Sequence, residues 1–342
     1  KENIMKKRRL AAWLMVLCLC AAALGGCGAK EEDKKADTAK EEQAKKDDKA
    51  KSQTPIKVGA LKGPTAMGMA QMLDDNQYEF TISASPDEIV PMIVQGQVDI
   101  AAVPANLAAV LYQKTQKQVN VLAVNTLGIL YLVENGNSIQ SVEDLKGKTI
   151  YASGKGATPE YALNSVLTAH GIDPLSDVTI EYKSEHAEVV AALAADPTAV
   201  GLLPQPFVTT AVMKNDQLRV ALDLNELWES GTEDGSRLVT GVAVVRKEFL
   251  EEQPKEVKAF MDAYRKSVDF VNEDTQAAAE IIGNHDIIAK EVAVKAIPEC
   301  SIVFVEGKEM KTMLSGYLNT LLGQNPETVG GAVPDDDFYY AR

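Results

Sequence analysis

From residue 55 onwards, short runs typical of β-strands alternate with amphipathic stretches of helical period. The expected strands are 56–61, 78–84, 98–103 and 119–127, and the expected helices between them are 66–73, 86–94 and 105–114. Alternation at this spacing is typical of βαβ units, in which parallel strands form a sheet that the helices cover. The pattern therefore predicts an α/β fold.

The second half of the chain repeats this pattern and then becomes mainly helical. The further strands expected are 129–133, 149–152, 178–182, 200–203, 219–222 and 238–246; the helices are 142–148, 159–169, 185–195, 254–272, 275–282, 289–296 and 307–322. Helix 254–272 carries Val257, Phe260, Tyr264 and Val268 at helical spacing, which predicts a core-facing stripe. Because 342 residues exceed the usual size of one hydrophobic core, roughly 250–300 residues, two lobes are expected.

The first 27 residues have the order of charges and apolar residues found in export signals. A basic run, Lys6 to Arg9, precedes an apolar stretch over 10–24. This stretch is shorter than the ~20 residues that a spanning helix needs. Residues 1–27 are therefore predicted to be a signal peptide, with Met5 as the expected start.

The signal ends in Leu24-Gly25-Gly26-Cys27, which resembles the lipobox of bacterial lipoproteins. Cys27 is therefore the predicted lipidation site, and an uncleaved anchor or ordinary secretion are the alternatives. Cys18 and Cys20 lie within the signal, so Cys300 is the single cysteine of the body. One cysteine excludes an internal disulfide there, and Cys300 is expected to be a buried small hydrophobic residue.

Residues 28–54 contain eight lysines, eight acidic residues and no large apolar residue. Such a segment cannot bury enough surface to offset the entropy of ordering, so it is predicted to be a flexible tether. The chain has a net charge of -14, but residues 55–342 hold 22 basic and 40 acidic residues, a net of -18. This excess of acid argues against a nucleic-acid partner.

Catalytic and metal-binding motifs are absent from the sequence. His170, His186 and His285 are far apart and form no HExxH motif, and no GxSxG motif occurs. The sequence accordingly predicts no metal, no cofactor and no enzyme activity.

Three short motifs resemble those of a known family. Ser141–Ile150 looks like its DLKGK element, and the stretch from Gln95 to Ala101 resembles its xGxxDxA strand entry. Gly171–Pro174, followed by Asp177 and Val178, resembles its GLxPxDV turn. The family is that of nitrate-, sulfonate- and taurine-binding proteins of ABC importers, which includes binders of thiamine pyrimidine precursors. The resemblance covers about residues 55–342.

This resemblance implies a two-lobed periplasmic-binding-protein-like fold of type II, with lobes joined by two crossing segments. Residues 55–130 and 240–342 would form lobe 1, and residues 131–239 would form lobe 2. The crossings are expected at 125–140 and 235–243, where glycines suit either a hinge or a simple turn.

By the same resemblance, the protein is expected to be a monomeric, lipid-anchored solute-binding component of an ABC importer on the extracytoplasmic face. It would capture a small polar or anionic solute, of the sulfonate, nitrate, taurine or pyrimidine-precursor class, and deliver it to a permease and ATPase complex. Two alternatives stay open: an enzyme of a cofactor-biosynthesis type that uses the same fold, and a membrane-tethered ligand sensor.

The solute is expected in the cleft between the lobes, where loops and helix N-termini converge. The candidate ligand-binding residues follow predicted strands: Gly63, Pro64, Thr65, Ser85, Pro104, Ala105, Asn106, Asn125, Thr126, Gly154, Lys155, Gly156, Ala157, Thr158 and Gln205. Each loop also has a purely structural interpretation as an ordinary helix cap. Four aromatic residues are further candidates for stacking or, alternatively, for core or rim positions: Tyr131, Tyr161, Phe207 and Trp228. Since no candidate loop contains arginine, a dianion held by guanidinium groups is not implied.

Overall fold

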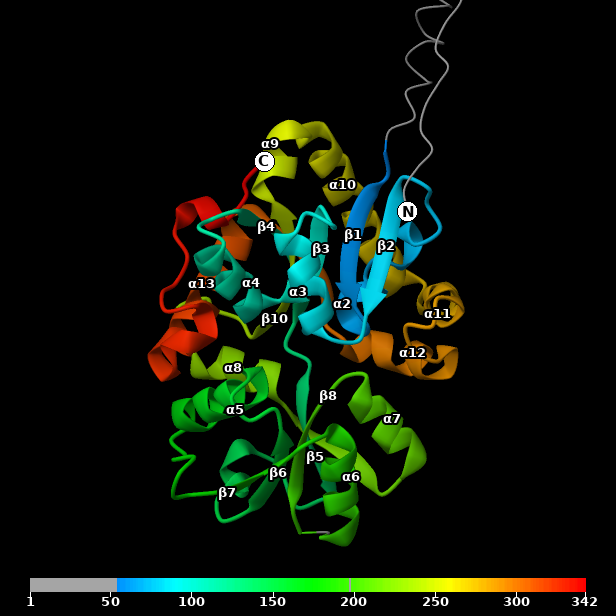
Figure 1. The fold of residues 1–342 in the computed structure, drawn as a ribbon. Helices are drawn as coiled ribbons and strands as arrows, with labels where there is room; N and C mark the ends of the chain where they lie inside the picture. Colours follow the sequence, from blue (N-terminus) through cyan, green and yellow to red (C-terminus); the bar gives the residue numbers. More distant parts are fainter. Residues whose placement is uncertain (1–53, 197) are drawn as a thin grey trace, which may run out of the picture. The chain divides into compact units, whose positions relative to one another are not determined.

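Two separate β-sheets organise the residues that the structure, a computed structural model, describes: 54–196 and 198–342 (Figure 1). The predicted signal peptide with Cys27 lies outside the described residues, as does the predicted tether up to residue 53. Among the described residues, no helix combines the length and the apolar character needed to cross a bilayer.

The first sheet has six strands in the order β11-β4-β10-β3-β1-β2. They are β1 (Ile56–Leu61), β2 (Tyr78–Ser83), β3 (Ile100–Pro104), β4 (Val119–Leu127), β10 (Val239–Arg246) and β11 (Ile302–Val305). β1 pairs in parallel with β2 and β3, whereas β10 is antiparallel to both β3 and β4. The parallel βαβ arrangement predicted for the first half is thus confirmed.

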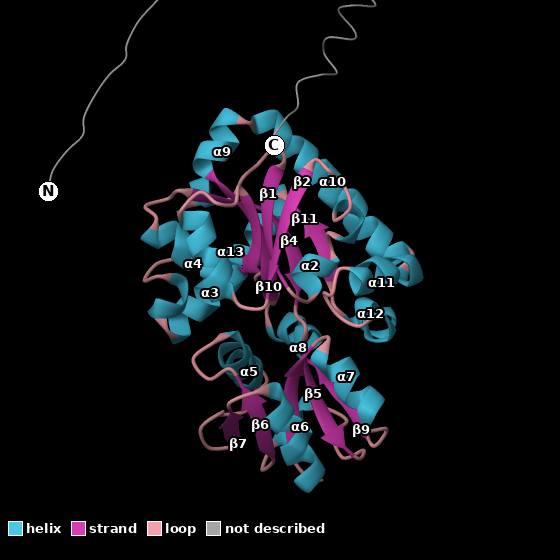
Figure 2. Cartoon of the chain, turned by 45° about the vertical axis from the view of Figure 1, so that its right-hand side comes forward, coloured by secondary structure: helices cyan, strands magenta, loops and turns pink. Residues whose placement is uncertain are grey.

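Helices cover both faces of this sheet (Figure 2). They are α2 (Pro64–Met67), α3 (Pro86–Val94), α4 (Ala105–Lys114), α9 (Lys247–Glu252), α10 (Pro254–Glu273), α11 (Thr275–Asn284), α12 (Lys290–Ala296) and α13 (Gly307–Gln324), with 3-10 turns η1 (Ala70–Met72), η3 (Ile297–Glu299), η4 (Pro326–Val329) and η5 (Asp336–Phe338). The predicted stripe of α10 is buried. Cys300 is buried too, and burial raises the pKa of its thiol, as expected for a hydrophobic position.

The second sheet has five strands in the order β7-β6-β8-β5-β9. They are β5 (Leu130–Asn135), β6 (Thr149–Ser153), β7 (Thr179–Lys183), β8 (Val200–Pro204) and β9 (Leu218–Asp223); the helices around them are α5 (Thr158–Ala169), α6 (His186–Ala195), α7 (Phe207–Lys214) and α8 (Leu224–Gly231), with η2 (Val142–Leu145). β6 is parallel to β7 and β8, and β5 is antiparallel to β8 and β9.

The structure corrects several predicted elements. Helix 66–73 is wrong, because the helix stops at Met67 and a 3-10 turn follows. A Cβ at Gly68 would lie 3.1 Å from Cγ2 of Ile302, so tertiary packing shapes this turn. Helices α7, α8 and α9 and strand β11 were not predicted. Each has at most eight residues, too few for a periodic pattern to be recognised.

The chain passes between the sheets at two places. Gly128 and Ile129 connect β4 to β5, and residues 232–238 connect α8 to β10. A Cβ at Gly128 would lie 2.7 Å from Cβ of Asn225 and 3.0 Å from Cδ2 of Leu238. Glycine is therefore required at this crossing by the close approach of two side chains.

A buried carboxylate stabilises the second sheet. Glu134 in β5 is 2% exposed and accepts hydrogen bonds from the Ser138 backbone N–H (2.9 Å), the Ser138 hydroxyl (2.8 Å) and the Ile139 N–H (3.2 Å). It also pairs with Arg219 of β9, whose side chain is 33% exposed, so water screens part of this attraction. Burial by itself would raise the pKa of Glu134. The hydrogen bonds and the Arg219 charge outweigh this effect, so the pKa of Glu134 lies below its ordinary value.

Glu134→Gln is expected to lower the free energy of unfolding by about 2–4 kcal/mol at pH 7, because a neutral amide weakens several charge-assisted bonds in a buried site. A carboxylate with a lowered folded-state pKa stabilises the protein above its unfolded-state pKa of about 4.3, and this contribution is lost as the pH falls through the folded-state pKa. The difference between variant and parent in urea unfolding should therefore shrink below about pH 4. Glu280→Gln, which removes the exposed pair with Lys290, is the control and should change little. A constant difference from pH 7 to pH 3 would contradict the prediction.

Candidate functional site

The carboxyl ends of the parallel strands in the two sheets face each other. β3 and β4 are both antiparallel to β10 and hence run in the same direction, so Leu127 at the end of β4 lies at the edge where β1, β2 and β3 end. In the second sheet, Leu130 at the start of β5 pairs with Pro204 at the end of β8. Only two residues separate Leu127 from Leu130. The two edges, called the facing edges below, therefore lie on either side of this crossing (Figures 1 and 2).

Three predicted loops lie at the facing edge of the first sheet. Gly63, Pro64 and Thr65 follow β1, and Ser85 follows β2. Pro104 ends β3, and Ala105 and Asn106 follow it. The Ser85 hydroxyl accepts a hydrogen bond from the Asp87 N–H at 3.2 Å, which confirms the predicted N-cap of α3. The Asn106 amide donates to the Thr328 carbonyl at 3.4 Å.

Polar side chains from different parts of the sequence surround Gly241 of β10 at the same edge. A Cβ at Gly241 would lie 2.5 Å from Oδ1 of Asn125, 3.0 Å from Cγ2 of Thr65 and 3.1 Å from Cβ of Thr126. Thr126 donates to Oδ1 of Asn125 at 3.1 Å. We call Thr65, Asn125, Thr126 and Gly241 the asparagine cluster.

Asn125 has no exposed surface, and its Nδ2 has no hydrogen-bond partner among the described residues. The phenol of Tyr264 on α10 lies beside it; burial raises the pKa of Tyr264, and the Asn125 side chain opposes this rise. An unpartnered buried amide is rare, because leaving a donor unsatisfied costs about 1–3 kcal/mol. By geometry this donor is left without a hydrogen bond, and the Tyr264 phenol is the acceptor described beside it.

The loop from Gly154 to Thr158 lies at the facing edge of the second sheet, between β6 and α5. Gly154 and Gly156 have φ of 78° and 77°, a backbone conformation that favours glycine. The Gly156 N–H donates to Oε2 of Glu160 at 2.5 Å. The loop thus already binds a carboxylate, and this carboxylate belongs to the chain itself.

Other residues of this loop contact neighbouring side chains. The Lys155 ammonium lies 5.7 Å from the centre of the Tyr182 ring, in a cation–π arrangement. Burial raises the pKa of Tyr317 of α13 to about 12, and the nearby Thr158 side chain opposes this rise, although the Tyr317 hydroxyl has no hydrogen-bond partner among the described residues. Ala157 is the N-cap position of α5 and supplies no side-chain bond.

Gln205, after β8, is 4% exposed and is mostly engaged within its own sheet. Its N–H donates to the Ile129 carbonyl at 2.8 Å, and its Oε1 accepts from the Thr209 N–H at 3.2 Å. It lines a cavity of about 370 Å³, together with Lys295 and Glu299. The other three cavities described for residues 54–196 and 198–342 contain none of the predicted loop residues, although the aromatic candidate Trp228 lines one of them.

Sequence reasoning missed Ser153 and His186, which also lie at the facing edge of the second sheet. The Ser153 hydroxyl is 2.6 Å from Nδ1 of His186, and the His186 ring is 5.2 Å from that of Phe207. Burial lowers the pKa of His186, although Glu185 opposes this. Ser153 follows the predicted strand 149–152, and His186 follows the predicted strand 178–182. Their position after a strand, which also selected Ser85, is the signal that could have identified them.

Three of the four aromatic candidates make structural contacts. The Tyr131 hydroxyl donates to the Glu299 carbonyl at 2.8 Å, and the Tyr161 hydroxyl accepts from Asn325 at 2.9 Å. Trp228 is 2% exposed and donates to the Ser236 hydroxyl at 3.2 Å. These three residues are buried, in line with the core alternative, and Phe207 is half-buried.

Known structures share this fold. An ABC transporter protein from Parabacteroides distasonis is 26% identical, with a TM-score of 0.72, and the match covers 85% of this chain and 100% of that one. The periplasmic aliphatic sulphonate binding protein SsuA from Escherichia coli is 15% identical, with a TM-score of 0.66, over 84% and 96% of the two chains.

A Candida albicans protein described as having the generic periplasmic binding protein fold is 15% identical, with a TM-score of 0.52, over 84% and 93% of the two chains. The predicted α/β, two-lobed periplasmic-binding-protein fold of type II is thus confirmed.

No curated protein matches this chain. Residues 52–291 match the family described as "ABC transporter, phosphonate, periplasmic substrate-binding protein". The predicted class, a substrate-binding protein of an ABC transporter, is confirmed, whereas the narrower nitrate, taurine or thiamine-precursor family is not. The chain belongs to the phosphonate periplasmic substrate-binding protein family of ABC transporters.

Proposed function

We propose that this protein captures a small organic oxyanion, a phosphonate or a sulfonate, between the facing edges. The observation that carries the proposal is the convergence of the starts of α3, α4, α5 and α6 on the carboxyl ends of the strands in both sheets. Helix starts present free N–H groups and the positive end of the helix dipole, which favour anions. The family description names phosphonates, and the E. coli structural neighbour is a sulphonate-binding protein.

The proposed ligand-binding residues are those of the predicted loops at the two facing edges and of the asparagine cluster, with Ser153 and His186 added. The buried Nδ2 of Asn125 supports this choice, because it makes no hydrogen bond of normal geometry with its neighbour Tyr264 and could donate to a solute oxygen. The net charge of -18 over residues 55–342 repels anions at long range, so local N–H donors must provide the attraction.

We also propose that residues 55–130 and 240–342 form lobe 1 and that residues 131–239 form lobe 2. This division is supported by the sheets, since the strands of the first sheet lie in the former ranges apart from Val239 at the start of β10, and those of the second lie in the latter range apart from Leu130 at the start of β5. Solute contacts to both lobes would shift the population towards a closed arrangement.

A titration-calorimetry series on the full chain tests the solute class. Methylphosphonate and ethanesulfonate are expected to bind one per chain, and nitrate, taurine and an aminopyrimidine are the comparison solutes. Binding of only the aminopyrimidine or only nitrate would replace the proposed class. Chemical turnover of a solute would favour the enzyme alternative.

Glu160→Gln is expected to tighten methylphosphonate binding about 5–10-fold, because it removes a negative charge beside the Gly156 N–H while keeping an acceptor there. Asp144→Asn is the matched control. Asp144 also accepts from backbone N–H groups, those of Gln140 and Ser141, but it precedes β6 and lies at the opposite edge of the second sheet. Calorimetry should show unchanged affinity for Asp144→Asn. Equal affinities for all three proteins would show that the α5 loop does not contact the anion.

We further propose lipid attachment at Cys27, a monomeric state, and delivery of the solute to an ABC permease and ATPase. The sequence Leu24–Cys27 and the periplasmic family support an extracytoplasmic, membrane-attached location. Solute uptake by cells that carry the permease distinguishes import from the sensor alternative: a sensor would bind the solute without any dependence of uptake on this protein.

A further inference from the structure

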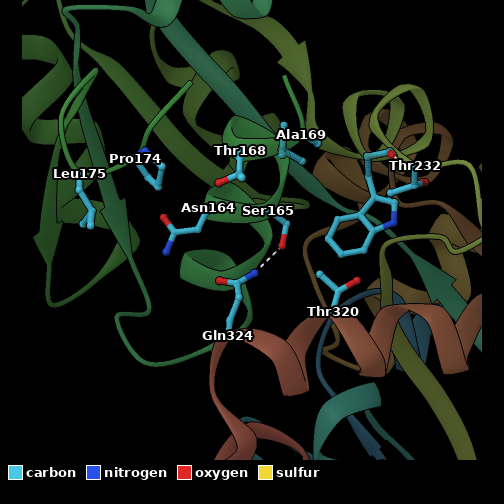
Figure 3. Close-up of a pocket in the computed structure, with 11 residues that line it drawn as sticks. Asn164, Ser165, Thr168, Ala169, Pro174, Leu175, Thr232, Thr320 and Gln324 are labelled. Atoms are coloured by element: carbon cyan, nitrogen blue, oxygen red, sulfur yellow. Dashed lines mark hydrogen bonds between the residues drawn. The ribbon is translucent and has the colours of Figure 1, made fainter. Parts of the chain in front are cut away.

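A second cavity, of about 560 Å³, lies between α5, α8 and α13, away from the helix starts (Figure 3). Asn164 and Thr168 contribute from the middle and last turn of α5, and Thr320 and Gln324 contribute from the end of α13. None of the proposed solute-binding residues lines it. Its volume falls in the range of small-molecule sites, roughly 300–1,000 Å³.

The wall of this cavity carries no charge. None of its lining residues is Asp, Glu, Lys or Arg, although the body of the chain has a net charge of -18. Apolar surface comes from Val166, Ala169, Pro174, Leu175 and Trp228. Leu175 is 93% exposed, which is unusual for a large apolar side chain. An uncharged, largely apolar wall does not compensate the desolvation of an ion, so the cavity excludes oxyanions and favours neutral molecules.

A few polar groups are available to orient such a molecule. The side chain of Asn164 has no hydrogen-bond partner among the described residues, and Figure 3 shows it among the side chains that line the cavity. Nε2 of Gln324 donates to the Tyr161 carbonyl at 3.0 Å and to the Ser165 hydroxyl. The Asn164 amide can therefore donate to or accept from a bound molecule without breaking a bond within the protein.

The two walls of the cavity belong to different sheets. α5 and α8 follow strands of the second sheet, whereas α13 packs against strands of the first. Gln324 and Asn325 bond to Tyr161 across this boundary, and the rings of Trp228 and Tyr317 are 5.7 Å apart. A molecule that contacts both walls binds best to one arrangement of the sheets and thereby stabilises it.

We propose that this cavity is a second binding site, for a small uncharged molecule with an apolar body and one hydrogen-bonding group. The site is separate from the facing edges, and the proposal does not depend on which solute binds there.

The neutral fluorescent probe N-phenyl-1-naphthylamine, which has two aromatic ring systems and one N–H group, tests the proposal on the full chain. Fluorescence titration is expected to show saturable binding of one probe per chain. Asn164→Phe, which fills the cavity, should weaken binding at least tenfold, and Thr168→Phe, which fills it from another position, should do the same. Asn319→Phe is the matched control, because Asn319 is an exposed asparagine on α13 that does not line the cavity. It should bind the probe like the parent protein.

A titration in the presence of saturating methylphosphonate separates this site from the facing edges. Retained probe binding is expected. Full competitive displacement by methylphosphonate would place the probe at the facing edges and overturn the proposal. Absence of saturable binding, or equal weakening by Asn164→Phe and Asn319→Phe, would overturn it as well. Thermal unfolding of each variant shows whether it is folded. If Asn164→Phe does not fold, Thr168→Phe supplies the test.

Discussion

Gly241→Val is expected to abolish methylphosphonate binding, with an affinity at least 100-fold lower than that of the parent protein. A Cβ at this position would lie 2.5 Å from Oδ1 of Asn125, 3.0 Å from Cγ2 of Thr65 and 3.1 Å from Cβ of Thr126. The new side chain must therefore displace three polar side chains of the proposed site together. Because the valine side chain overpacks the site, the free energy of unfolding of the variant should also fall by about 1–3 kcal/mol.

Gly241→Ala adds the same Cβ without the two methyl groups and should weaken binding at least tenfold. Gly323→Ala is the control: nothing lies within 4 Å of a Cβ at Gly323 in α13, and alanine favours a helix by up to about 1 kcal/mol. Calorimetry and thermal unfolding of the three variants measure these effects. Undiminished affinity of folded Gly241→Val for methylphosphonate would show that the asparagine cluster is not part of the binding site.

Cys27→Ser is expected to release nearly all of the protein from the membrane fraction of cells. The predicted lipid requires a thiol for its thioether bond, and a serine hydroxyl does not form that bond. Each buried CH₂ of an acyl chain contributes about 0.8 kcal/mol to membrane attachment, so loss of the lipid removes most of the binding free energy.

Cys20→Ser is the matched control for this experiment. Cys20 lies in the apolar stretch before the proposed cleavage position, so its replacement should leave the protein in the membrane fraction. Ultracentrifugation with immunoblotting measures the distribution, and mass spectrometry of the N-terminal peptide detects the lipid. A Cys27→Ser protein that stays in the membrane fraction without lipid would favour the uncleaved-anchor alternative.

The strand and helix pattern could be predicted from the sequence wherever the elements are long. Strands β1 and β4 and helix α10 agree with the predicted ranges within one residue. The short elements α7, α8 and β11 could not be predicted, because local sequence barely distinguishes them from loops. α8 depends on its cap, in which the Asp223 carboxylate accepts from the Asn225 N–H at 2.7 Å.

The loops of the candidate site could also be located from the sequence, because the carboxyl ends of parallel strands meet at one edge. What those loops do could not be predicted in the same way. The Gly154–Thr158 loop looked free to bind an anion, yet the Glu160 carboxylate already accepts the Gly156 N–H. A bond between residues four positions apart at a loop–helix junction depends on the backbone conformation at two glycines, which the sequence permits but does not require.

By itself, the sequence determined the α/β class and the ends of strands at which a site is expected, and it predicts a signal peptide and a tether before an acidic body. Each of these depends on local periodicity, on composition or on the order of elements along the chain. Only the tertiary structure decided that Thr65, Asn125 and Gly241 touch, and that an uncharged cavity forms between α5, α8 and α13. The physical reason is that residues separated by 60 or more positions meet through the pairing of strands and the packing of helices, which no local pattern encodes.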